Sequence, residues 1–196
     1  MFYSLAAFFV RAFFRIVFFM RVDGKENVPM EGGLLFCANH RSNWDPPAVA
    51  AAFPRKISIM AKEELFQKPL LGRLIKALRA FPIRRGKGDA GAVMATLKLL
   101  GSGDATLVFP EGTRVRSEEE RKREINPGII RIAIKARVPI LPCYTNGKYR
   151  PFGGLKVTFG KPISYEEYYD EAPDKETLQR LANELMAAIY SLAEVK

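Results

Sequence analysis

Short apolar runs alternate with segments of helical character along most of the chain, and this alternation restricts the possible folds more than any other feature. Apolar runs bounded by turn residues predict strands at 32–39, 56–62, 80–83, 104–110, 138–147 and 155–163. Helix formers with end signals predict helices at 45–53, 68–78, 89–103, 128–137 and 174–195. The pattern therefore predicts an α/β fold, a single sheet domain with helices on both faces, in which mixed strand directions are possible.

The 196 residues show no internal repeat and no low-complexity linker. We therefore expect one α/β domain over residues 22–196, preceded by a separate segment at 1–21. The two cysteines, Cys37 and Cys143, lie in apolar runs and are expected to be small buried hydrophobic residues, without the surroundings of a thiolate nucleophile. Two cysteines and one histidine exclude a disulfide scaffold and a recognisable metal site, and they favour a reducing compartment.

The segment at 2–20 differs from the rest of the chain because it contains seven of the 14 phenylalanines. On a helical projection Ser4, Arg11 and Arg15 fall on one line, opposite apolar residues that include Phe9 and Phe13. This pattern is typical of a helix that lies in a membrane interface with its guanidinium groups at headgroup level. The predicted membrane contacts are Phe2, Phe9, Arg11, Phe13 and Arg15.

Three other interpretations of this segment stay open: a membrane-spanning helix, a core helix of the domain, and a signal peptide. The formal net charge of +10 points to a polyanionic partner, which could be a nucleic acid, a phosphorylated ligand or an anionic membrane. A phenylalanine-rich helix does not help nucleic-acid binding, and basic and aromatic residues are not interleaved elsewhere. We therefore expect an anionic membrane surface as partner and no nucleic acid.

His40 is the sole histidine, and it stands directly after the predicted strand at 32–39, with Asp45 five residues further on. Imidazole is the usual general base at neutral pH, and a neighbouring carboxylate fixes its tautomer and supports its positive charge. This pattern predicts His40 and Asp45 as a catalytic pair. A loop histidine followed by Asp45 as a helix N-cap, with Pro46 at the first helical position, is the structural alternative.

Two further polar stretches follow predicted strand ends. In VFPEGTR, residues 108–114, Gly112 lets the backbone approach a ligand, Arg114 can hold a phosphate with two hydrogen bonds, and Glu111 can pair with a cation or hydroxyl. In FPIRRGKGD, residues 81–89, basic side chains stand beside glycines. Each stretch taken alone is also compatible with a solvated surface turn.

Taken together, these stretches resemble the lysophosphatidic acid acyltransferase family, the 1-acylglycerol-3-phosphate O-acyltransferases of phospholipid synthesis. The resemblance covers residues 22–165, and the four sequence blocks of the family occur in order. They are a histidine, four residues and an aspartate (His40 to Asp45), RAFPIRR with its arginine at Arg85, FPEGTR at 109–114 and VPILP at 138–142.

The resemblance implies transfer of a fatty acyl group from a thioester to the sn-2 hydroxyl of lysophosphatidic acid, giving phosphatidic acid. It implies that His40 removes the hydroxyl proton and that Asp45 orients His40. The implied substrate-binding residues are Arg85, Glu111, Gly112, Thr113 and Arg114.

No metal or bound cofactor is implied, and the acyl donor would be an acyl carrier protein or coenzyme A thioester. The enzyme would act at the cytoplasmic face of the cell membrane as a peripheral or monotopic protein. An acyltransferase for another lyso-lipid, and a non-catalytic module that binds membrane surfaces, are the alternatives.

Overall fold

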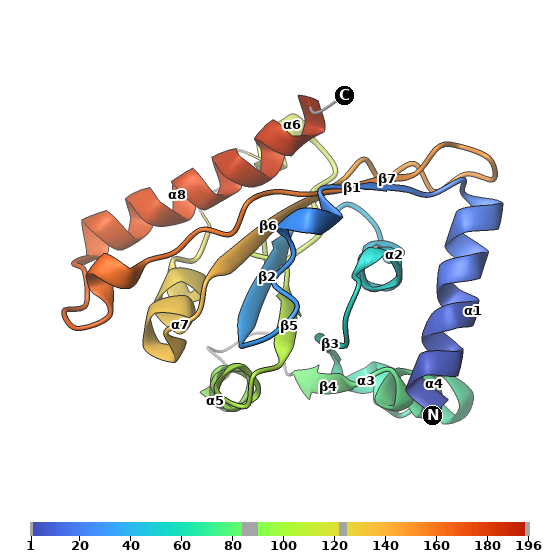
Figure 1. Ribbon diagram of the computed structural model, residues 1–196, viewed down its shortest axis with the longest axis horizontal. Helices are drawn as coiled ribbons and strands as arrows, with labels where there is room; N and C mark the ends of the chain where they lie inside the picture. Colours follow the sequence, from blue (N-terminus) through green and yellow to red (C-terminus); the bar gives the residue numbers. More distant parts are fainter. Residues whose placement is uncertain (1, 84–89, 122–124, 195–196) are drawn as a thin grey trace.

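The computed structural model describes residues 2–83, 90–121 and 125–194, and it contains one seven-stranded sheet with helices on both faces (Figure 1). The strand order is β1-β7-β6-β2-β5-β3-β4, and all neighbours are parallel except β6 and β7. The strands are β1 (Arg21–Asp23), β2 (Leu34–Ala38), β3 (Ile57–Lys62), β4 (Ala80–Ile83), β5 (Ala105–Val108), β6 (Ile140–Thr145) and β7 (Lys156–Phe159). The predicted α/β sheet is confirmed, and β1 is a strand that the sequence did not predict.

The helices follow the predicted segments closely, and two short helices are additional. The α-helices are α1 (Phe2–Val17), α2 (Asp45–Ala52), α3 (Glu63–Phe66), α4 (Pro69–Ala77), α5 (Ala90–Gly101), α6 (Glu118–Arg121), α7 (Gly128–Ala136) and α8 (Lys175–Ser191). The short helix α6 interrupts the long polar segment that follows β5, and α3 follows β3 without a break. Both are four residues long, which explains why no amphipathic period reveals them.

The central strand β2 separates two apolar cores. Side chains alternate between the faces of a strand, so Leu34 and Phe36 face one layer while Leu35 and Cys37 face the other. The first core includes α1 and α2, and the second includes α7 and α8 (Figure 1). All five residues of β2 are fully buried, as expected for a parallel strand covered on both sides.

Helix α1 packs on α2 with one face and leaves the other face exposed. Phe14 and Phe18 are 1% and 5% exposed and belong to the core, whereas Phe9 and Ile16 are 63% and 66% exposed. The core-helix interpretation therefore holds for one face of α1, and the predicted apolar surface exists on the other. In the described part of the chain, no helix is both long and apolar enough to cross a membrane.

Arg11, one of the predicted membrane contacts, is tied to the domain by two hydrogen bonds. Its guanidinium group faces the domain and donates from Nε to the carbonyl of Ala51 at 2.9 Å and from Nη2 to the carbonyl of Phe53 at 3.0 Å. These carbonyls lie at the carboxyl end of α2, where backbone acceptors lack partners within the helix. Arg11 supplies the missing donors and so fastens α1 to α2.

This division of α1 predicts unequal effects of two phenylalanine substitutions. Phe14→Ala should lower the free energy of unfolding by about 3 to 5 kcal/mol, because it removes a fully buried ring and leaves a cavity. Phe9→Ala, the matched control on the exposed face, should change it by less than about 0.5 kcal/mol. Urea unfolding of both variants measures the difference. Equal losses would show that the two faces of α1 are not divided in this way.

Candidate active site

The carboxyl ends of three adjacent parallel strands bring the predicted catalytic residues together. Strand β2 lies between β5 and β6 and runs parallel to both, so the three strands end at one edge of the sheet. His40 follows β2, the turn at 109–114 follows β5, and Tyr149 lies shortly after β6. Ligand sites of open α/β sheets form at such an edge, where neighbouring loops diverge.

His40 and Asp45 form the predicted pair. The distance from His40 Nδ1 to Asp45 Oδ2 is 3.0 Å, and both side chains are buried. An ionised carboxylate only accepts hydrogen bonds, so Nδ1 is the donor in this contact, and in the neutral imidazole Nε2 then carries the lone pair. The ring of Phe109 stacks on the imidazole at 4.2 Å between centroids and 26° between planes, which limits its rotation.

Asp45 does not cap the helix in the way the sequence suggested. It is the first residue of α2 and Trp44 occupies the N-cap position without a side-chain cap. The carboxylate points back into the preceding loop, where Oδ2 accepts from the backbone N–H groups of Arg41 and Ser42, both at 2.6 Å. Asp45 therefore shapes the loop that carries His40, besides contacting the imidazole itself.

The backbone of His40 is held by the turn that follows β5. Its N–H donates to Glu111 Oε2 at 2.6 Å, and its carbonyl accepts from the N–H of Val115 at 2.8 Å. The other oxygen of Glu111 accepts a short hydrogen bond from the hydroxyl of Tyr190 in α8. Both oxygens of Glu111 thus have partners within the chain, and one of them holds the backbone of His40.

Burial controls the protonation of this cluster. Desolvation raises the pKa of Glu111 above its ordinary value, although the hydrogen bonds from Tyr190 and from His40 N–H partly offset this effect. Desolvation and the contact with Glu111 also raise the pKa of Tyr190, so its hydroxyl stays protonated and remains a donor. The guanidinium group of Arg121 lies 3.7 Å from the centre of the Tyr190 ring and contributes a cation–π contact.

The remaining residues of the 109–114 turn lie at its tip. Gly112 has φ 65°, a left-handed conformation that favours glycine, and its N–H closes the turn on the carbonyl of Phe109 at 3.0 Å. Thr113 is exposed and Arg114 is half-buried, with no ion pair to any described residue. Arg114 directly precedes Val115, which contacts the backbone of His40, and a guanidinium group is suited to an anionic ligand. Arg85 lies outside the described residues.

Tyr149 is a site residue that the sequence did not reveal. Its hydroxyl donates to Asp45 Oδ1 at 2.6 Å, so both oxygens of this carboxylate have partners. Burial and the nearby charge of Asp45 raise the pKa of Tyr149, which keeps this donor protonated. Tyr149 comes from a loop 104 positions away, and a single tyrosine in a loop carries no recognisable sequence signal.

An aromatic cluster connects α1 to this site. Phe18 contacts the ring of Tyr149 at 6.0 Å and that of Trp44 at 5.9 Å between centroids. Trp44, the sole tryptophan, also stacks on Phe13 at 6.2 Å and precedes Asp45 in the chain. Trp44 therefore packs directly against α1, and Tyr149 packs against Phe18 just after this helix.

Comparison with known proteins agrees with this geometry. The family model described as Acyltransferase matches residues 19–146, a range that contains His40, Asp45 and the whole 109–114 turn. The chain belongs to the acyltransferase family. The resemblance inferred from the sequence is confirmed, and so is the interpretation of the chain as an enzyme of this type.

Individual relatives are similar over most of this acyltransferase. The 1-acyl-sn-glycerol-3-phosphate acyltransferase of Bacillus subtilis is 28% identical over 179 residues, which cover 88% of this chain and 87% of the relative. The Streptococcus pneumoniae protein of the same name is 29% identical over 82% of this chain, which spans 60% of that protein's length. The crystal structure of the 1-acyl-sn-glycerophosphate (LPA) acyltransferase PlsC from Thermotoga maritima has a TM-score of 0.74 and 25% identity, covering 98% of this chain and 79% of that one.

The burial of Glu111 predicts a pH-dependent stability difference. Because its pKa is raised in the folded state, the group stabilises the fold below its ordinary pKa, and this contribution is lost as the pH rises through the folded-state pKa. Glu111→Gln keeps an acceptor for His40 N–H and does not ionise. The free energy of unfolding of the variant relative to the wild type should therefore increase from pH 4 upward, as measured by urea unfolding at a series of pH values.

Glu171→Gln is the control for this prediction because Glu171 is exposed. Its difference from the wild type should stay nearly constant over the same pH range. A constant difference for Glu111→Gln as well would show that burial does not raise the pKa of Glu111.

Proposed function

We propose that the chain transfers a fatty acyl group from a thioester donor to the sn-2 hydroxyl of lysophosphatidic acid, giving phosphatidic acid. The observation that carries the proposal is the buried contact between His40 Nδ1 and Asp45 Oδ2, at the sheet edge where the turn that contains Arg114 also begins. The names of the Bacillus subtilis and Streptococcus pneumoniae relatives support this acceptor.

In the proposed reaction, His40 Nε2 takes the proton of the sn-2 hydroxyl as its oxygen attacks the thioester carbonyl. The carbon–sulfur bond then breaks, and the leaving thiolate takes the proton from the imidazolium. The negative charge of Asp45 stabilises the imidazolium between these two steps. Neither cysteine is suited to form a covalent intermediate, since burial raises the pKa of Cys37 and of Cys143 and keeps both thiols protonated.

The acceptor's phosphate would be held by Arg114, with Gly112 and Thr113 at the open tip of the same turn. A guanidinium group can give a phosphate two parallel hydrogen bonds, and this one has no acidic partner among the described residues. Arg85 is the second proposed phosphate ligand. The donor would be an acyl carrier protein or coenzyme A thioester, and the reaction needs no bound metal or cofactor.

We further propose that the exposed face of α1 rests in the membrane interface at the cytoplasmic face of the cell membrane. Leu5, Phe8, Phe9 and Ile16 are all more than half exposed. Phe19 and Phe152 continue this apolar surface, with ring centroids 5.0 Å apart. Burying several such side chains in lipid is favourable by roughly 1.5 to 3 kcal/mol each before ordering costs, so the acceptor's own membrane would retain the enzyme.

Two substitutions test the catalytic pair separately from the fold. His40→Ala should lower kcat by about 10²- to 10⁴-fold because it removes the base. Asp45→Asn can still accept from the N–H groups of Arg41 and Ser42, and its amide can donate to Tyr149, so it should stay folded and lose most of its activity with the charge. The assay is acylation of lysophosphatidic acid in detergent, with product detected by mass spectrometry and folding checked by circular dichroism. Near wild-type turnover of a folded His40→Ala variant would refute the mechanism.

Arg114→Ala tests the acceptor. Loss of a hydrogen bond to a charged phosphate costs about 1.5 to 3 kcal/mol, so the KM for lysophosphatidic acid should rise by about tenfold or more. The KM for the thioester should change little. Arg116→Ala, in the same loop and exposed, is the control. A rise in the thioester KM alone would assign Arg114 to the donor, and better turnover of another lyso-lipid in a panel would assign a different acceptor.

A further inference from the structure

A small basic cleft lies at the carboxyl end of α2, away from the catalytic pair. Its volume is about 120 Å³, and its lining includes Arg11, Arg15 and Lys25 together with Ala52 and Pro54. In liquid water each molecule occupies about 30 Å³, so the cleft has room for a group the size of a phosphate. Asp45 stands at the other end of α2, about 10 Å along the helix axis, so this cleft is separate from the candidate active site.

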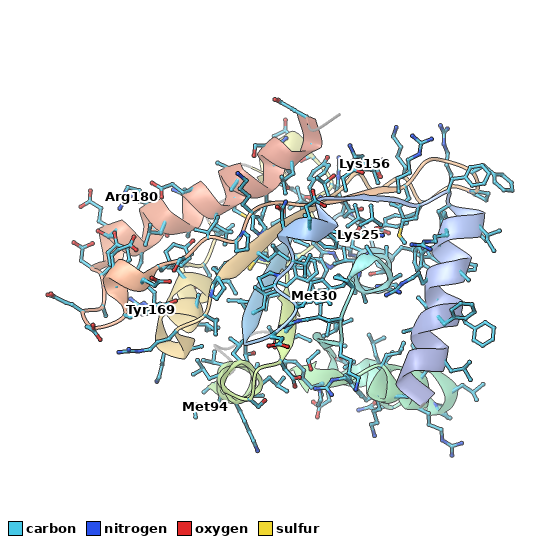
Figure 2. The ribbon with its side chains drawn as sticks, viewed as in Figure 1. Lys25, Met30, Met94, Lys156, Tyr169 and Arg180 are labelled. Atoms are coloured by element: carbon cyan, nitrogen blue, oxygen red, sulfur yellow. The ribbon has the colours of Figure 1, made fainter. Side chains whose placement is uncertain are left out.

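The cations of the cleft are not balanced by acidic groups. None of the residues that line it is acidic. Asp23, the acidic residue nearest to Lys25 on its amino-terminal side, pairs instead with Lys156 at 2.9 Å (Lys25 and Lys156 are labelled in Figure 2). Within the described part of the chain, neither Arg15 nor Lys25 makes an ion pair or a side-chain hydrogen bond. Two unpaired cations that face one cleft repel each other, and an anion between them removes that repulsion.

The backbone around the cleft is fixed, so the site is formed before a ligand arrives. Arg11 is held by its two hydrogen bonds to the carbonyls at the end of α2, which neutralises the negative end of that helix. Lys25 follows Gly24, whose φ is 71° and where an added Cβ would lie 2.0 Å from the carbonyl oxygen of Phe159. Only glycine fits this turn, and the turn directs the chain into the short helix that begins at Lys25.

The position of the cleft on α1 indicates the class of anion. With a step of about 100° per residue, Arg11 and Arg15 lie along one edge of the helix, between its packed face and its exposed face of Phe8, Phe9 and Ile16. An anion held at this edge would have the exposed apolar face beside it. A phospholipid has this combination, since its phosphate adjoins its acyl chains.

We propose that Arg15 and Lys25 bind the phosphate of an anionic diacyl phospholipid in this cleft, with the acyl chains along the exposed face of α1. Arg11 holds the cleft in shape. The bound lipid would be a structural ligand that fixes the enzyme on the membrane, and it would differ from the acceptor because it has no free sn-2 hydroxyl.

The test compares a cleft variant with a variant of equal charge loss. Arg15→Gln combined with Lys25→Gln removes the proposed phosphate contacts, and Arg131→Gln combined with Lys135→Gln removes two exposed cations from α7. The full-length protein is titrated calorimetrically with dihexanoyl phosphatidylglycerol below its micelle-forming concentration. The cleft variant should show a Kd raised by about tenfold or more, and the α7 variant should stay within about twofold of the wild type.

Each other outcome has a defined meaning. Equal Kd values for the wild type and the cleft variant would overturn the proposal. A second result would also overturn it: the cleft variant no longer binds vesicles of equimolar phosphatidylcholine and phosphatidylglycerol, but the wild type shows no detectable binding of the monomeric lipid. Membrane binding would then come from diffuse surface charge and not from a lipid site. If inorganic phosphate binds the wild type as tightly as the lipid does, the ligand of the cleft is a free anion and the lipid proposal is overturned. None of these measurements requires turnover, so they are independent of the proposed reaction.

Discussion

The buried carboxylate of Asp45 is the contact on which the rest of the site depends. It is fully buried and has four hydrogen-bond partners: the imidazole of His40, the N–H groups of Arg41 and Ser42, and the hydroxyl of Tyr149. A buried charge is tolerated only when such donors surround it. Because this one carboxylate accepts hydrogen bonds from several segments, it fixes the positions of the loop after β2, the start of α2 and the loop after β6. The carboxylate proposed to support His40 is therefore also a structural anchor.

The site also depends on parts of the chain that have no chemical role. His40 is held by Glu111, Glu111 by Tyr190, and Tyr190 is carried by α8 on the second face of the sheet. On the first face, Phe18 of the segment after α1 packs on Tyr149. The pair of His40 and Asp45 is thus held from both layers. In the proposed reaction, such support would keep the donor and acceptor atoms within hydrogen-bond distance without reorganisation.

The sequence alone was sufficient for the α/β architecture, because buried parallel strands are apolar throughout and the helices between them end at clear signals. The pair of His40 and Asp45 was also predictable, since both residues lie in one loop. The contributions of Tyr149 and Tyr190 were not, because they reach the site from 104 and 79 positions away and depend on how the layers pack. The projection of α1 placed Arg11 on a polar line correctly but could not show that this line borders the carboxyl end of α2. Local patterns report which side chains share a face, and only tertiary packing decides what that face meets.

The pairing of the first strand with the last has a consequence for biosynthesis. Arg21 of β1 aligns with Lys156 of β7, so the strand with which β1 pairs is made 135 residues later. At the usual rate of translation this delay is roughly 7 to 27 s. During that interval Phe18 lacks the ring of Tyr149 and its carbonyl lacks the N–H of Leu155, both of which contact it in the folded domain. The proposed membrane contact of α1 would then have a second use, because a nearby bilayer would shelter the phenylalanine rings of the emerging chain until β7 is made.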